Sequence, residues 1–162
     1  MHIGIVVHSN SGHTLRVASE LRRHLDEVGH SVRLEELEAS APVRGGTTEV
    51  ISKTIPSLDE CDTVVLGSPV NGGQMSGMMR GYLSQVPSLE GKRVAFLLTH
   101  FFPQAWGTRQ TIEEMANLCE SKGASVVGWA DVRWPNLRRR QDIATAVEKL
   151  MALVSAPDAA MA

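Results

Sequence analysis

The sequence contains few cysteines and aromatic residues and no large excess of either charge. Its two cysteines, Cys61 and Cys119, lie far apart without a CxxC pattern. Neither a disulfide framework nor a metal site is therefore expected, and both thiols are expected to be buried in a reducing compartment. The formal net charge of −2 gives no reason to expect nucleic acid or an anionic membrane as a partner. No apolar run approaches the roughly 20 residues that a membrane-spanning helix needs.

The amino terminus also lacks a basic segment followed by an apolar run. We therefore expect no signal peptide and a cytoplasmic location. Hydrophobic residues make up 43% of the chain and charged residues 21%, as in ordinary globular proteins. A length of 162 residues fits one domain, which we expect over residues 1–154, followed by a flexible tail over 155–162.

Buried-strand patterns alternate with amphipathic helix patterns along the chain. The expected strands cover residues 3–8, 31–37, 63–67, 92–99 and 125–130, and the expected helices begin near residues 15, 75, 112 and 143. The second strand alternates apolar and polar residues, which is typical of a sheet edge. A short amphipathic piece is expected over 48–55. This alternation predicts an α/β domain with a parallel sheet and helices on both faces.

Three unusual loops, 9–14, 68–74 and 100–107, follow expected strands at the carboxyl edge of this sheet. In open parallel sheets, ligands bind at that edge, where the strand order reverses. The three loops therefore mark the expected ligand site.

The first loop has the composition of an anion-binding loop. It comprises Ser9, Asn10, Ser11, Gly12, His13 and Thr14. The backbone N–H groups that open a helix are unpaired, hydroxyl groups can add donors, and Gly12 lets the backbone approach an anion. The loop contains no lysine, and the pattern GxxxxGK[ST] is absent, which favours a monophosphate over a triphosphate with magnesium. An ordinary polar loop with a helix cap is the alternative.

The first loop resembles the phosphate loop of the flavodoxin family, whose pattern is roughly [ST]-x-[ST]-G-x-[ST]. Residues 67–83 are similar to the second flavin loop and following helix of that family, and most resemble its NAD(P)H:quinone oxidoreductase branch. Residues 91–96 are similar to the lead-in to its fourth strand. The resemblance spans residues 3–154. It implies a flavodoxin-like, doubly wound, five-stranded parallel sheet of order 2-1-3-4-5 that binds FMN.

The resemblance also implies the roles of individual residues. Those expected to hold the FMN phosphate are Ser9, Ser11, Gly12, His13 and Thr14, with Asn10 in the same turn. Those expected to border the isoalloxazine ring are Pro69, Val70, Asn71, Gly72 and Gly73 on one side and Thr99, His100, Phe101, Trp106 and Gly107 on the other. The family often stacks an aromatic residue from the second loop on the flavin, and positions 70–74 carry none. Phe101, Phe102 or Trp106 could replace it, or could serve core packing or a subunit contact.

The resemblance favours an FMN oxidoreductase that takes electrons from NAD(P)H and passes them to a quinone or similar acceptor. The flavin would carry the chemistry, with no essential acid–base side chain. The alternative is a flavodoxin-type electron carrier that serves a redox protein, although carriers of that kind use a strongly acidic docking face. A receiver-like domain is disfavoured because Ser9 and Asn10 stand where an acidic cluster is needed. The sequence leaves open whether the protein forms a homo-oligomer.

Two other features each allow both a structural and a ligand-binding explanation. His100 could donate a hydrogen bond to the flavin or substrate, or could be a structural loop histidine. The run Arg138-Arg139-Arg140 is typical of a solvated helix start, and nucleotide-phosphate binding is the alternative.

Overall fold

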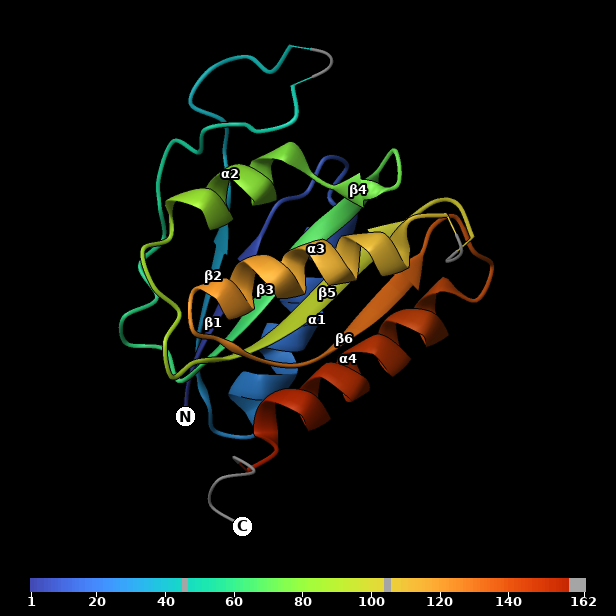
Figure 1. Ribbon diagram of the computed structural model, residues 1–162. Coiled ribbons are helices and arrows are strands. Elements are labelled where there is room, and N and C mark those ends of the chain that lie inside the picture. The colour runs from blue at the N-terminus through green and yellow to red at the C-terminus, as the bar shows by residue number, and fades with distance from the viewer. Residues whose placement is uncertain (45–46, 104–105, 158–162) are drawn as a thin grey trace.

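The computed structural model describes residues 1–44, 47–103 and 106–157. Parts of the expected 100–107 loop and of the expected tail therefore lie outside the described residues. The elements in chain order are β1 (His2–Val7), α1 (His13–Glu27), β2 (Ser31–Glu36), β3 (Thr63–Asn71), β4 (Gln74–Met75), α2 (Gly77–Gln85), β5 (Arg93–His100), α3 (Thr108–Ser121), β6 (Ser125–Arg133) and α4 (Arg139–Ser155) (Figure 1).

The main sheet has five parallel strands in the order β2-β1-β3-β5-β6. This order confirms the predicted 2-1-3-4-5 arrangement, with the small strand β4 added antiparallel to β3. The strand order reverses between β1 and β3. In open α/β sheets, this reversal opens a crevice at the carboxyl edge.

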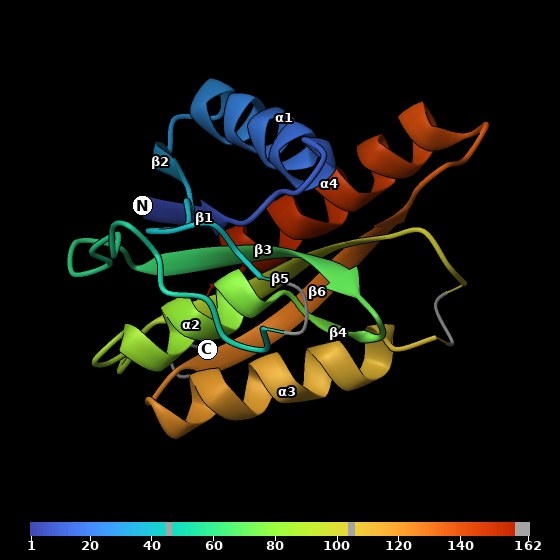
Figure 2. The same cartoon turned by 90° about the horizontal axis from the view of Figure 1, so that it is seen from above.

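Helices cover both faces of the sheet, with α1 and α4 on one side and α2 and α3 on the other (Figure 2). Side chains of β1 alternate between the two cores. Ile3 and Ile5 pack in the core under α1 and α4, whereas Val6 packs in the core under α2 and α3. Cys61 and Cys119 are buried in the second core, as expected. The buried strand runs in the sequence therefore reflect a sheet that is covered on both sides.

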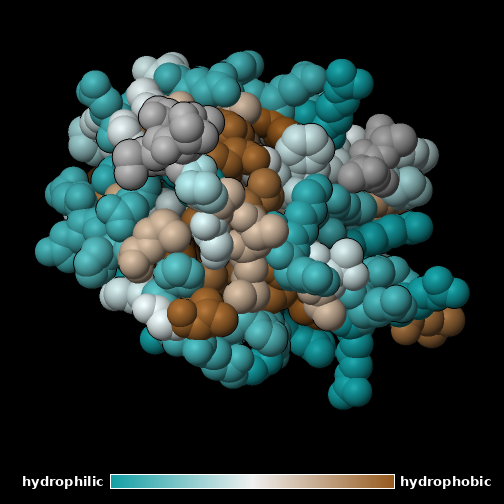
Figure 3. Space-filling view, turned by 90° about the horizontal axis from the view of Figure 1, so that it is seen from below, coloured by the Kyte–Doolittle hydropathy of each residue, from teal (hydrophilic) through white to brown (hydrophobic). Residues whose placement is uncertain are grey.

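The surface view from below shows apolar side chains in the middle of the face, surrounded by hydrophilic ones (Figure 3). Among the helices of the described chain, none combines the length and apolar character needed to cross a membrane.

The predictions for two local segments, 68–74 and 48–55, were wrong. The segment 68–74 is largely a β-hairpin rather than a loop, because β3 continues to Asn71 and turns at Gly72 and Gly73, whose φ angles are +56° and +77°. Glycine is favoured in such a turn. The short amphipathic piece expected over 48–55 is neither a helix nor a strand of the sheet. Instead, Val50 donates its N–H to the carbonyl of Gly77 at 2.9 Å, and its carbonyl lies where a Cβ on Gly81 would stand.

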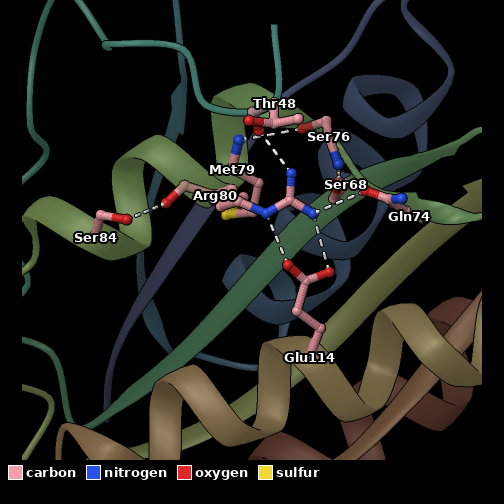
Figure 4. Close-up of polar contacts among 8 residues, drawn as sticks. All are labelled: Thr48, Ser68, Gln74, Ser76, Met79, Arg80, Ser84 and Glu114. Carbon is pink, nitrogen blue, oxygen red and sulfur yellow. Dashed lines mark hydrogen bonds and ion pairs between the residues drawn. The ribbon is translucent and has the colours of Figure 1, made fainter. Parts of the chain in front are cut away.

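Arg80 connects α2 to α3, to β4 and to the segment around Thr48 (Figure 4). Its guanidinium donates to both carboxylate oxygens of Glu114 on α3, at 2.7 and 3.1 Å. It also donates to the carbonyl of Thr48 at 2.6 Å and to the side chain of Gln74 at 3.4 Å. These contacts hold β4, and with it the second loop, against α2 and α3.

Candidate functional site

The three predicted loops meet at the carboxyl edge of the sheet, where they enclose two neighbouring cavities. The smaller has a volume of about 50 Å³ and is lined by residues of 9–14, 69–71 and 99–101 and by Trp134. The larger has a volume of about 620 Å³ and is lined mainly by residues 70–73 and 100–103 and by Trp106. Val70, Asn71, His100 and Phe101 line both, so the two cavities adjoin.

The floor of the small cavity is the amino end of α1. Gly12 precedes the helix with φ +81°, a left-handed conformation that glycine adopts without strain, and as the N-cap residue it has no side chain to cap the helix. The first turn contains no acidic residue. In the described chain, the backbone N–H groups of residues 10–14 donate to no protein acceptor. Unpaired N–H groups and the positive end of the helix dipole together favour an anion at this position.

Polar side chains of the first loop reach across to the other two loops. The hydroxyl oxygens of Thr14 and Thr99 lie 2.7 Å apart, and both side chains are buried. The amide of Asn10 donates to the amide oxygen of Asn71 at 3.3 Å. Ser9 accepts a long hydrogen bond of 3.4 Å from the N–H of Leu15. These contacts fix the first loop relative to β3 and β5.

Trp134 closes one side of the small cavity, and sequence reasoning missed it. The His13 ring stacks on its indole with centroids 4.1 Å apart and an interplanar angle of 15°. The guanidinium groups of Arg139 and Arg16 lie 4.7 and 5.8 Å from the same ring. Burial, followed by the charges of Arg139 and Arg16, lowers the pKa of His13. The sequence pattern ends this strand at residue 130. Because β6 instead runs to Arg133, it brings Trp134 to the carboxyl edge.

The second and third loops touch backbone to backbone. A Cβ on Gly107 would lie 2.2 Å from Cα of Gly73. Gly107 has a φ angle of +107° and precedes α3 without a side-chain cap. A third hollow, of about 590 Å³, adjoins the larger cavity here and is lined by Gly107, Arg109 and Gln110 as well as Gly72, Gly73, Phe102 and Trp106.

The aromatic residues of the third loop are not core residues. Phe101, Phe102 and Trp106 are 51%, 65% and 68% exposed. The rings of Phe102 and Trp106 stack at 5.8 Å, and both line the larger cavity. Core packing is therefore excluded as the explanation for these side chains, which leaves a ligand or partner contact.

His100, which ends β5, is the buried polar residue common to both cavities. Its side chain is 5% exposed, and its Nε2 lies 2.8 Å from Oδ2 of Asp131 on β6. Its Nδ1 lies 2.6 Å from the carbonyl oxygen of Phe102. The hydrogen bond with Asp131 raises the pKa of His100, against the opposing effect of burial.

The structure brings the predicted site residues together. Those that line the cavities or the adjoining hollow are Ser9, Asn10, Ser11, His13, Thr14, Pro69, Val70, Asn71, Gly72, Gly73, Thr99, His100, Phe101, Trp106 and Gly107. Gly12 lies beside them as the residue before α1. Within residues 1–44, 47–103 and 106–157, no group of three or more metal-ligating side chains occurs.

Comparison with known proteins gives no match among protein-family models and none among curated sequences. Solved structures do match over nearly the whole chain. Oxidised flavodoxin 1 from Bacillus cereus superposes with a TM-score of 0.67 at 16% identity, covering 98% of this chain and 100% of that one. The fold is flavodoxin-like.

Two further structures with this flavodoxin-like fold extend the comparison. A putative flavoprotein from Bacteroides uniformis has a TM-score of 0.69 at 13% identity, covering 89% of this chain and 96% of that one. The Trp repressor binding protein from Bacillus subtilis has a TM-score of 0.66 at 15% identity, covering 91% and 99%. At these identities, the likeness establishes the architecture, and the site must be argued from its own residues.

Proposed function

We propose that the three-loop edge binds FMN and that the protein is an FMN oxidoreductase, taking electrons from NAD(P)H and passing them to a quinone or similar planar acceptor. The observation that carries this proposal is the pair of adjoining cavities. One is small, bordered by the hydroxyl and amide side chains of the first loop and built on a helix amino terminus, and the other is large and lined by aromatic side chains. FMN has the same division into a phosphate and a planar ring.

The small cavity suits the phosphate. The unpaired N–H groups of residues 10–14 and the dipole of α1 supply donors and positive potential without a lysine. The space beside Gly12 is open, since a Cβ at this position would meet nothing within 4 Å. An anion can therefore approach the backbone there. Arg16 and Arg139 add positive charge behind His13 and Trp134.

The large cavity suits the isoalloxazine ring. Its volume of about 620 Å³ lies within the range of roughly 300–1,000 Å³ that is usual for ligand pockets. The exposed rings of Phe101 and Phe102 offer flat apolar contacts, and the Gly72–Gly73 turn also lines the cavity. When bound, FMN supplies the acceptance of a hydride, which is two electrons with one proton, from NAD(P)H and the delivery of electrons to the acceptor.

The charges at the mouth of the site favour small charged or planar reactants over a positively charged redox protein as the partner. Arg133 and Arg109 are the charged residues, besides His100, among the described side chains that line the larger cavity and the hollow beside it, and no carboxylate lines either. The described residues that line these two hollows therefore offer no acidic docking face of the kind that electron carriers use. Arginine side chains suit the phosphate groups of NAD(P)H.

The cofactor assignment is tested by calorimetric titration of the flavin-free protein with FMN and with riboflavin, which lacks the phosphate. We expect FMN to bind at least 100-fold more tightly, or about 3 kcal/mol in free energy. Gly12→Asp should abolish this preference, because it adds a carboxylate at the anion site. The matched control is Gly29→Asp, at the other end of α1, where φ is also positive and a Cβ also meets nothing. Equal affinity for the two flavins would contradict the phosphate site.

The enzymatic assignment is tested with FMN-loaded protein, NADH or NADPH, and a soluble quinone. Steady oxidation of the nicotinamide that depends on the quinone supports the oxidoreductase. Tight FMN binding with no nicotinamide oxidation would instead support the electron carrier.

A further inference from the structure

The His100 ring has an acceptor at each of its two nitrogen atoms. The carbonyl oxygen of Phe102, 2.6 Å from Nδ1, has no proton to give, so Nδ1 must carry the proton of that hydrogen bond. The carboxylate of Asp131, 2.8 Å from Nε2, is likewise an acceptor when ionised. Both hydrogen bonds are made together only by the doubly protonated, positively charged imidazolium.

The positive charge of this pair lies on the ligand side. His100 lines both cavities, whereas Asp131 lines neither and stands behind it on β6. The charged groups that act on His100 are Asp131 and Arg133, both on β6, and Arg133 also lines the larger cavity. Arg133 is held by a hydrogen bond of 3.3 Å to the carbonyl of Phe101. Two cations therefore face the larger cavity, and no carboxylate of the described residues does.

We propose that Asp131 holds His100 as an imidazolium at neutral pH beside the isoalloxazine ring, and that this charge makes reduction of the bound flavin easier. The proposal rests on the proposed FMN site and assigns His100 and Asp131 a positioning and tuning role within it. Reduction adds electron density to the ring, so a fixed neighbouring cation stabilises the reduced form more than the oxidised form. Because the cation is buried, solvent screens its effect only weakly.

The charge state is tested first on the flavin-free protein, so that the result does not depend on FMN binding. Nitrogen-15 NMR distinguishes a doubly protonated ring from either neutral tautomer, and the spectrum of His100→Gln assigns the signals. We expect both His100 nitrogens to carry protons at pH 7.5, and we expect Asp131→Asn to convert the ring to a neutral form at that pH. A neutral His100 ring in the unaltered protein at pH 7.5 would overturn the proposal, whether or not FMN binds.

The effect on the flavin is tested by spectroelectrochemical measurement of the midpoint potential in FMN-loaded protein. His100→Gln should weaken the preference for reduced over oxidised FMN about tenfold, which corresponds to a drop of ~30 mV for a two-electron couple. Asp131→Asn should shift the potential in the same direction. His100→Lys keeps a positive charge and should retain a potential closer to that of the unaltered protein than His100→Gln does.

The control is His24→Gln on α1, which lines neither site cavity and should leave the potential unchanged. If His100→Gln does not fold, Asp131→Asn decides the matter by the same measurement. Equal potentials in the unaltered protein and in the variant that folds would overturn the proposal. Failure of FMN to bind the unaltered protein would instead overturn the proposed function, while the NMR result would still stand.

Discussion

The hydroxyl groups of Thr14 and Thr99 share a hydrogen bond of 2.7 Å, although 85 positions separate the two residues in the sequence. Thr14 lies in the first turn of α1, and Thr99 lies near the end of β5. Their contact joins the first loop to β5 at the small cavity, which both residues line. Because both side chains are buried, each hydroxyl depends on the other for a partner.

Removing one of these hydroxyls should lower the free energy of unfolding by more than half of what removing both lowers it. We expect Thr14→Val and Thr99→Val each to lower the free energy of unfolding by about 1–2 kcal/mol, because each leaves a buried hydroxyl unpaired. The double variant should lose less than the sum of the two. Urea denaturation of all four proteins measures this coupling, and strict additivity would show that the hydrogen bond adds nothing.

A methyl group on Gly107 should separate the second and third loops. Gly107→Ala places a Cβ 2.2 Å from Cα of Gly73, so the backbone must move. We expect a larger loss of stability than the roughly 1–2 kcal/mol of positive-φ strain alone, together with weaker FMN binding. Thermal unfolding and FMN titration are the measurements.

Gly91→Ala is the control for that variant, because Gly91 also has a positive φ but a Cβ there meets nothing within 4 Å. It should show the strain cost and leave FMN binding unchanged. Equal effects of the two substitutions on stability and on FMN binding would mean that the loop contact has no role.

The ion pair between Arg80 and Glu114 should contribute measurably to stability. The Arg80 side chain is 18% exposed and donates two hydrogen bonds to the carboxylate. Glu114→Gln should lower the free energy of unfolding by about 1–3 kcal/mol, since one charge then lacks its ionic partner.

The matched comparison is Glu113→Gln, one position earlier on α3. Its partner Arg109 has a side chain that is 91% exposed, so we expect a loss of only ~0.5 kcal/mol or less. If denaturation gave the same small loss for both glutamates, the bidentate geometry would have no energetic consequence.

The partly buried His8 and the buried His100 should give stability pH dependences of opposite sign. Burial lowers the pKa of His8 below 6.5, whose Nδ1 lies 2.9 Å from the hydroxyl of Ser76, itself an acceptor from the N–H of Met79. The folded state then disfavours protonated His8, so its contribution to stability is present above pH 6.5 and is lost as the pH falls below that value. Asp131 raises the pKa of His100, so its contribution is present below pH 6.5 and is lost as the pH rises through the raised value.

These dependences are checked by urea denaturation between pH 5 and pH 9. His8→Gln should remove part of the loss of stability at acidic pH. His100→Gln should cost most at acidic pH and progressively less toward alkaline pH. Profiles parallel to that of the unaltered protein in both variants would contradict the pKa shifts.

The sheet and the location of the site could be predicted because local patterns determine them. Apolar runs marked β1, β3, β5 and β6, an alternating apolar and polar pattern marked the edge strand β2, and β-α alternation is compatible with few topologies. The first loop could be identified because Gly12 and its hydroxyl neighbours precede a strongly amphipathic helix. These features depend on residues that are close together in the sequence.

The misses depended on contacts between distant residues. The segment 48–55 has an amphipathic pattern, but it packs as irregular chain against α2, with the backbone of Val50 lying on Gly81. The hairpin at 68–75 exists because β3 continues past the sheet edge. Trp134 and Asp131 joined the site because β6 runs three residues further than its apolar pattern indicates. No local signal links Asp131 to His100, 31 positions earlier.

The stacking of His13 on Trp134 also gives the protein a built-in optical probe. Trp134 lines the small cavity and is 6% exposed, whereas Trp106 lines the larger cavity and is 68% exposed. The remaining tryptophan, Trp129, lies elsewhere on β6 beside Lys149. The two ends of the site can therefore be followed separately by the intrinsic fluorescence of single-tryptophan variants, with inorganic phosphate changing the emission of Trp134 and a flavin ring quenching that of Trp106.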